Sequence, residues 1–195
     1  VPREHPPWPL EPFEILHPRV SPDLDGFTIL HIADQHVRRI APRPVALERL
    51  IHAVAKIHVD LVAITGDLMN LPPDEDAAFD SFLRLSRAWN SRHGALAIPG
   101  NHDSPTLIHR LKSAAPHVRW LEHELLTLPR ADGTPLLRVL GSGHPERVLD
   151  DMLTAGDDRS PPFTLALVHY PTEIFAASDL QGPDRIDLIL AGHTH

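Results

Sequence analysis

Six short apolar runs, separated in several places by stretches of helical periodicity, constrain the fold of this chain more than any other feature of its sequence. Each run is long enough for a buried strand. The runs are Phe27–Ala33, Leu61–Thr65, Ala95–Ile98, Leu136–Leu140, Thr164–Val168 and Ile186–Ala191. We therefore expect a protein built on six buried strands.

Apolar side chains recur at helical spacing between these runs. The predicted helices cover Val45–Ile57, Phe79–Trp89 and Leu107–Ala115, with two shorter ones at Pro145–Leu153 and Thr172–Ala177. Ser104 followed by Pro105 is typical of a helix N-cap and first turn, and it predicts where the third helix begins. Strands that alternate with helices indicate an α/β or layered α–β–α architecture.

The N-terminal stretch differs in composition from the rest. Residues 1–26 contain seven prolines, which remove backbone donors and oppose both helices and sheet ladders. We interpret residues 1–26 as a proline-rich arm over the surface, and residues 27–195 as one domain. The chain begins with Val1 rather than Met, which is compatible with a signal or anchor upstream.

Charge and cysteine content exclude some classes of protein. The net charge of −8 argues against broad nucleic-acid affinity, which depends on Lys and Arg. A small phosphate substrate stays compatible with this charge, because bound cations would change the local sign. The chain has no cysteine, so a disulfide framework and a thiolate metal site are excluded. No run of 18 apolar residues occurs, so the sequence predicts no membrane span in this stretch.

Residues of metal-binding type follow five of the six predicted strands. These segments are Asp34-Gln35-His36, Gly66-Asp67, Pro99-Gly100-Asn101-His102-Asp103, His169 and Gly192-His193-Thr194-His195. Sites in open α/β sheets form at the carboxyl ends of the strands, so we expect these side chains to converge. His, Asp and Asn are ligands for hard to borderline metal ions.

The spacing within the segments supports this interpretation. Asp34 and His36 would point the same way if their strand continued, and so would His193 and His195. A glycine in three of the segments permits a sharp exit and a close approach of backbone to a bound ion. Because the chain has 15 histidines, one or two matches would be ordinary polar residues at strand ends. Five matches of the right chemical type are not explained by turns alone.

In these segments the chain resembles the calcineurin-like metallophosphoesterase family, whose motifs occur in the same order between residues 34 and 195. The resemblance implies a layered α-β-β-α sandwich, with further strands after His195 that a truncated chain would lack. Length and spacing are most similar to small bacterial members that export or anchor a single catalytic domain. The phosphoprotein phosphatase branch carries Val-Asp-Arg-Gly soon after Gly-Asp. Leu68-Met69-Asn70 stands here instead, which disfavours that branch.

The resemblance also implies roles for individual residues. The residues expected at a first metal ion are Asp34, His36, Asp67 and His195, and those expected at a second are Asp67, Asn101, His169 and His193. Asp67 would bridge the two ions. His102 is the expected catalytic residue, which would stabilise charge on the phosphate or protonate the leaving oxygen. Asp103 would orient His102, or it would only place a negative charge at the start of the helix near Ser104.

The expected function is hydrolysis of a phosphomonoester, phosphodiester or pyrophosphate bond by a hydroxide that bridges two divalent metal ions. Ligands without sulfur suit Mn²⁺, Fe, Zn²⁺ or Co²⁺, and the sequence does not choose among them. The expected partner is a small-molecule or lipid-linked phosphate substrate.

Two alternatives stay open. One is a metal-binding scaffold without turnover, and the other is a nuclease of the same superfamily, which the acidic balance disfavours. Localisation is open between the cytoplasm and a membrane-associated or exported state. Membrane association would depend on segments outside this chain.

Overall fold

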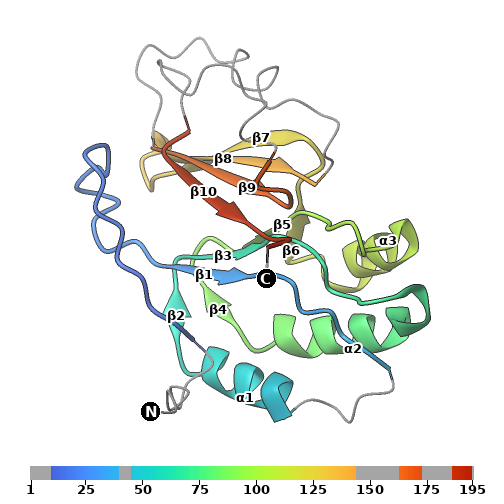
Figure 1. The fold of residues 1–195 in the computed structure, drawn as a ribbon. Helices are drawn as coiled ribbons and strands as arrows, with labels where there is room; N and C mark the ends of the chain where they lie inside the picture. The colour runs from blue at the N-terminus through green and yellow to red at the C-terminus, as the bar shows by residue number, and fades with distance from the viewer. Residues whose placement is uncertain (1–9, 40–44, 144–162, 173–185, 195) are drawn as a thin grey trace, which may run out of the picture.

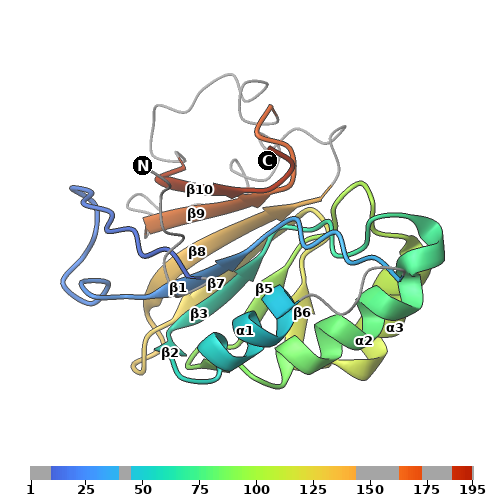
Figure 2. The same cartoon turned by 60° about the horizontal axis from the view of Figure 1, so that its bottom comes forward.

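Two four-stranded sheets pack face to face in the computed structural model, which describes residues 10–39, 45–143, 163–172 and 186–194 (Figure 1). Helices α1 (Val45–Val54), α2 (Glu75–Ser86) and α3 (Pro105–Ala114) cover the outer face of the first sheet, and Figures 1 and 2 agree on this arrangement. The expected layered α/β fold is therefore confirmed.

The first sheet is entirely parallel, in the order β1-β3-β5-β6. Its strands are β1 (Ile29–Ile32), β3 (Leu61–Ile64), β5 (Ala95–Ala97) and β6 (Val118–Trp120). The last residues of all four strands lie side by side, since Ile32 pairs with Ile64, Ile64 with Ala97, and Ala97 with Trp120. The segments that follow these strands therefore leave the sheet at one edge.

The second sheet has the order β10-β9-β8-β7. It consists of β7 (Glu124–Pro129), β8 (Pro135–Ser142), β9 (Phe163–Val168) and β10 (Leu188–Ala191), in which only the β7–β8 pair is antiparallel. Ser142, Val168 and Ala191 end their strands side by side. A small separate sheet pairs β2 (His58–Val59) with β4 (Asn90–Ser91).

Three predicted helices are present with different bounds: the first ends earlier than predicted, and the other two begin and end earlier. They are α1 (Val45–Val54), α2 (Glu75–Ser86), which follows a 3₁₀ turn η1 (Pro72–Asp74), and α3 (Pro105–Ala114). The predicted N-cap is confirmed, because the Leu107 N–H donates to Ser104 Oγ at 2.9 Å. The prediction that the second helix reaches Trp89 was wrong. Trp89 lies beyond the helix and packs edge-on against Phe82. Its apolar side chain therefore fits the helical spacing because it packs on the same core, not because it belongs to the helix.

The core has two large layers. Val62, Ile64 and the apolar faces of the helices form one layer behind the first sheet. Leu61 and Ala63 point the opposite way, into the layer between the two sheets. Strand β3 is therefore buried on both faces, as expected for a central parallel strand.

Part of the proline-rich N-terminal stretch lies on the second sheet. An ion pair joins Arg19 Nη1 to Asp187 Oδ1 at 3.3 Å, and the His17 ring meets the Phe163 ring edge-on at 5.4 Å. Leu24 is buried, whereas Phe13 and Leu16 are more than four-fifths exposed. These contacts connect the segment before β1 to the sheet that is most distant from it in sequence.

Four strands in the described residues were not predicted: β2 and β4 of the small sheet, and one strand in each of the four-stranded sheets. Val118–Trp120 is short, and its middle residue is the exposed Arg119, so it carries little apolar signal. Glu124–Pro129 is half exposed at the edge of its sheet. The helices predicted at Pro145–Leu153 and Thr172–Ala177 fall outside the described residues, apart from Thr172. Within the described ranges, no helix combines the length and apolar character that crossing a membrane requires.

Candidate metal centre

Asp67 lies at the centre of the strand-end residues. It is 1% exposed, and its Oδ2 atom lies 3.5 Å from His36 Nε2 and 3.4 Å from His169 Nε2. Two groups of side chains could each hold a cation, and they are His36 with Asp67 and His102, and Asp67 with His169 and His193. The ligand atoms within each group lie within 4.8 Å of one another. The same carboxylate therefore belongs to both groups.

The hydrogen-bond chemistry of the second group fits a cation. His169 Nδ1 lies 2.7 Å from the Thr65 carbonyl oxygen, to which it must donate. In the neutral ring Nε2 then carries a lone pair, yet this atom faces Asn101 Oδ1 at 2.9 Å and the Asp67 carboxylate. A positive charge among these acceptors would relieve their repulsion. A proton on His169 is one such charge, and a divalent cation is another.

The pKa values of this group reflect the same electrostatics. Burial by itself would lower the pKa of His169, but hydrogen bonds to Asp67 and to the Thr65 backbone outweigh it and raise the pKa above its usual value. Burial by itself would raise the pKa of Asp67. Hydrogen bonds from His169 and from the His102 backbone N–H outweigh that effect, and the pKa is lowered. The site therefore favours a carboxylate next to a positive charge.

Left-handed backbone turns present these side chains. Four candidate ligands have positive φ angles, namely Asp34 (50°), His36 (41°), Asp67 (57°) and His193 (68°). Such angles are uncommon outside glycine, and they concentrate at functional sites. The strand geometry under which Asp34 and His36 would point the same way is not present, since β1 ends at Ile32. The turns, rather than strand alternation, bring the side chains together.

Three glycines let the segments that follow the strands pack directly on each other. A Cβ atom on Gly66 would lie 2.2 Å from the Gly100 backbone nitrogen, and a Cβ on Gly100 would lie 2.2 Å from Asp67 Oδ1. A Cβ on Gly192 would lie 2.8 Å from the Thr65 carbonyl oxygen. Glycine at these positions therefore has a steric reason.

The structure brings the expected second ligand set together. His193 Nδ1 lies 3.1 Å from Asn101 Oδ1, which also contacts His169. Asp34 joins this side of the site, because its Oδ1 accepts the backbone N–H of His193 at 2.9 Å. In Figure 1 the C-terminal end of the described chain accordingly lies beside the end of β1.

The expected first set is only partly described. His36 and Asp67 lie together, but the third side chain grouped with them is His102, which meets the His36 ring edge-on at 4.8 Å. His195 lies outside the described residues.

Three further groups at the site were not anticipated from the sequence. His102 Nδ1 lies 2.6 Å from the Asn70 carbonyl oxygen, which fixes the ring. The Thr65 carbonyl orients His169, as described above. The ring of Tyr170, the only tyrosine in the chain, lies 4.5 Å from the His193 ring and 5.0 Å from the His169 ring. Carbonyl groups carry no sequence signal, whereas Tyr170 could have been noted as the neighbour of His169.

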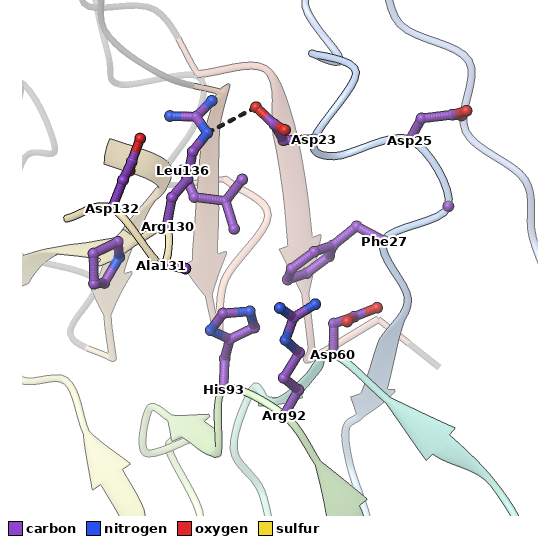
Figure 3. A pocket seen from close by; sticks show the side chains of 12 residues that line it. Asp23, Asp25, Phe27, Asp60, Arg92, His93, Arg130, Ala131, Asp132 and Leu136 are labelled. Carbon is purple, nitrogen blue, oxygen red and sulfur yellow. Dashed lines mark hydrogen bonds and ion pairs between the residues drawn. The ribbon is translucent and has the colours of Figure 1, made fainter. Parts of the chain in front are cut away.

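A cavity of about 620 Å³ lies at the opposite end of the strands (Figure 3). Its polar side chains include four aspartates, two arginines and a histidine, namely Asp23, Asp25, Asp60, Asp132, Arg92, Arg130 and His93. Asp23 and Arg130 form an ion pair at 2.8 Å across it. The ring of Phe27 stacks on that of His93 with centroids 5.7 Å apart. This cavity is separate from the metal-ligand residues, which follow the strands rather than precede them.

The fold and the site define an α/β sandwich protein with a two-part candidate metal centre at its strand ends. The sequence model of the calcineurin-like phosphoesterase family matches residues 27–195. The chain therefore belongs to this family, and the resemblance noted from its motifs is confirmed.

Curated relatives agree with this assignment. The chain is 29% identical to an uncharacterized metallophosphoesterase, YkuE, of Bacillus subtilis, over 88% of this chain and 59% of the relative. It is 27% identical to an uncharacterized metallophosphoesterase of Helicobacter pylori strain J99, over 86% of this chain and 44% of the relative. The chain thus spans about half the length of these relatives. A solved structure, the phosphopantetheinyl hydrolase of Mycobacterium tuberculosis, aligns with a TM-score of 0.46 at 15% identity, covering 80% of this chain and 73% of that one.

Proposed function

We propose that residues 27–195 form the catalytic domain of a metal-dependent phosphoesterase that hydrolyses a phosphomonoester, phosphodiester or pyrophosphate bond. The observation that carries the proposal is the position of Asp67, whose buried carboxylate belongs to two groups of potential metal ligands at once. The Oδ2 atom of this carboxylate faces His36 of one group and His169 of the other, so it suits a bridge between two cations. The family match over the same residues supports a phosphate-bearing substrate.

The geometry supports Asp67, His169, His193 and Asn101 as ligands of one ion, and His36 with Asp67 as ligands of the other. Asp34 and His195 are assigned to the second of these ions from the family motifs. Divalent ions in such a centre act as Lewis acids on phosphate oxygens and acidify the attacking water. Imidazole, carboxylate and amide ligands suit Mn²⁺, Fe, Zn²⁺ or Co²⁺.

His102 is the residue that we assign to proton transfer. Its Nδ1 atom is committed to the Asn70 carbonyl at 2.6 Å, which leaves Nε2 as the ring atom available to a substrate. Its backbone N–H donates to Asp67 Oδ1 at 2.8 Å, so the His102 backbone is held next to the bridging carboxylate. A protonated Nε2 would donate to a phosphate oxygen or to the leaving oxygen.

The His169 side chain has a separate task. Its Nδ1–H is held by the Thr65 carbonyl, so the ring is kept in the tautomer that presents Nε2 to a metal ion. His169 is fully buried, and the ring is therefore fixed before a cation arrives.

The test uses the full chain stripped of metal with a chelator and then reloaded with Mn²⁺, Zn²⁺ or Co²⁺. We expect metal-dependent hydrolysis of p-nitrophenyl phosphate or bis-p-nitrophenyl phosphate, and the ratio of the two rates would identify the preferred bond type. Metal binding without turnover of either compound would favour a scaffold over an enzyme. Failure to bind any of the three metals would overturn the proposal.

A further inference from the structure

The carboxylate of Asp103 joins the two backbone segments that form the candidate metal centre. Its Oδ2 atom accepts the backbone N–H groups of Asp67 and Gly100, both at 2.9 Å. Its Oδ1 atom accepts those of Leu68 at 2.8 Å and Met69 at 3.3 Å. Both oxygens are therefore occupied by the segments that follow β3 and β5.

From this geometry, and resting on the proposed function, we infer that Asp103 is a positioning residue that holds the backbone of Asp67 and so aims the bridging carboxylate at both metal sites. It acts on the metal centre through Asp67 and not through the His102 ring.

The conformation at Asp67 explains why such a support is needed. Asp67 has a φ of 57° and follows Gly66 with a φ of 88°, so the chain reverses sharply at the strand end. Successive backbone N–H groups in a turn of this kind point to one side and attract an anion. The Asp103 carboxylate supplies that anion from within the chain.

Asp67 and Asp103 also hold each other's segments. The Asp67 N–H donates to the Asp103 side chain, and the Asp67 side chain accepts the N–H of His102, the residue before Asp103. With Asp67 Oδ1 used in this way, Oδ2 is the oxygen that lies toward His36 and His169. If the hydrogen bonds to Asp103 are lost, the position of Asp67 Oδ2 relative to His36 and His169 becomes less well defined.

The contacts in the structure distinguish this role from two simpler ones. The His102 ring is oriented by the Asn70 carbonyl, not by Asp103. The first turn of α3 is capped by Ser104 Oγ, which accepts the Leu107 N–H. Within the described residues, the Asp103 carboxylate accepts instead the backbone N–H groups of residues 67–69 and 100.

The test is the Asp103→Asn variant of the full chain, with affinity for Mn²⁺ measured by isothermal titration calorimetry. The amide keeps the size of the side chain but replaces one acceptor with a donor that faces N–H groups. We expect Mn²⁺ affinity to fall about 10- to 100-fold, the range seen when a group that supports a metal ligand is removed. Affinity within about twofold of the unmodified protein would overturn the inference.

Asp74→Asn is the matched control. Asp74 is also buried, and its carboxylate also accepts backbone N–H groups, those of Arg39 at 2.7 Å and Leu71 at 3.1 Å. This variant should lose thermal stability as Asp103→Asn does, while its Mn²⁺ affinity stays unchanged. Equal losses of Mn²⁺ affinity in both variants would reduce the effect to general destabilisation and overturn the inference.

Two further variants separate the remaining possibilities. Asp103→Glu keeps the negative charge near α3 but displaces the carboxylate oxygens. If Asp103 positions the Asp67 backbone, Mn²⁺ binding becomes weaker in this variant. If Asp103 only supplies a charge to the helix, Mn²⁺ affinity stays unchanged. The same variant also replaces Asp103→Asn if the latter does not fold. In a His102→Ala background, Asp103→Asn should weaken Mn²⁺ binding by the same factor, whereas an effect that vanishes there would assign Asp103 to His102. Absence of Mn²⁺ binding by the unmodified protein would instead count against the proposed function.

Discussion

The two ends of the strands carry similar residues in opposite electrostatic circumstances. At the carboxyl end, the buried Asp67 and His169 and the exposed Asn101 direct acceptor atoms at one another. At the amino end, in the cavity of Figure 3, the carboxylates face donors of the chain itself. Asp60 Oδ2, for example, accepts both the N–H and the hydroxyl of Thr28, at 2.8 and 2.9 Å.

The pKa directions of the carboxylates do not separate the two ends, because hydrogen bonds also lower the pKa of Asp67. At the amino end, hydrogen bonds from Thr134 lower the pKa of Asp132, as for any exposed carboxylate that has found donors. At the carboxyl end, the pKa of His169 is raised in spite of burial, because the ring lies among acceptors that include Asp67 and the Thr65 backbone. The comparison teaches that residue type alone does not define a cation site. A site needs acceptors that converge without enough donors of their own.

Substitution of one aspartate at each end would test the comparison most strongly. Asp67→Ala removes the shared ligand of both groups, so we expect metal-dependent turnover to fall by more than about 100-fold, beyond the loss seen for groups that only support ligands. Asp60→Asn, the matched change at the amino end, should cost about 1 kcal/mol of stability with turnover unchanged. Steady-state rates and thermal melts of both variants measure this. Near-normal turnover in Asp67→Ala would break the comparison.

A pair of glycine substitutions gives a smaller but sharper test. In Gly100→Ala the new Cβ would meet Asp67 Oδ1 at 2.2 Å, so we expect a loss of about 3 kcal/mol, the upper range for over-packing, together with weaker metal binding. Gly133 has a φ of 84° and no atom near its Cβ position. Gly133→Ala should therefore cost about 1–2 kcal/mol from backbone strain alone and leave metal affinity intact. Chemical denaturation and calorimetric titration with Mn²⁺ distinguish the two, and equal metal affinities would contradict the steric argument.

The pH dependence of metal stabilisation should show the smallest effect. The pKa of His169 is raised above its unfolded value of about 6.5. Without metal, its protonated form therefore adds stability that is fully present below pH 6.5 and is lost as pH rises through the folded pKa. A metal ligand must be neutral, so metal binding adds stability in the opposite direction. The increase in Tm on adding Mn²⁺ should shrink steadily from pH 8 to pH 5. An increase that is constant over this range would exclude His169 as a ligand.

Local patterns in the sequence predicted much of the architecture. The apolar runs predicted six strands of the two sheets, because a buried parallel strand needs an uninterrupted apolar segment. They missed Val118–Trp120 and Glu124–Pro129, which are short or half exposed and depend on their neighbours for pairing. Ser104 was predictable as an N-cap since capping is a local interaction.

The sequence by itself determined which side chains stand at the strand ends and in what order, because apolar segments and the residues that follow them are local properties. The tertiary structure alone decided that left-handed turns present Asp34, Asp67 and His193, and that Asp103 supports Asp67 while the Asn70 carbonyl holds His102. The reason is physical. A backbone angle and the partner of a buried polar atom depend on segments that are distant in sequence and meet only when the two sheets pack together.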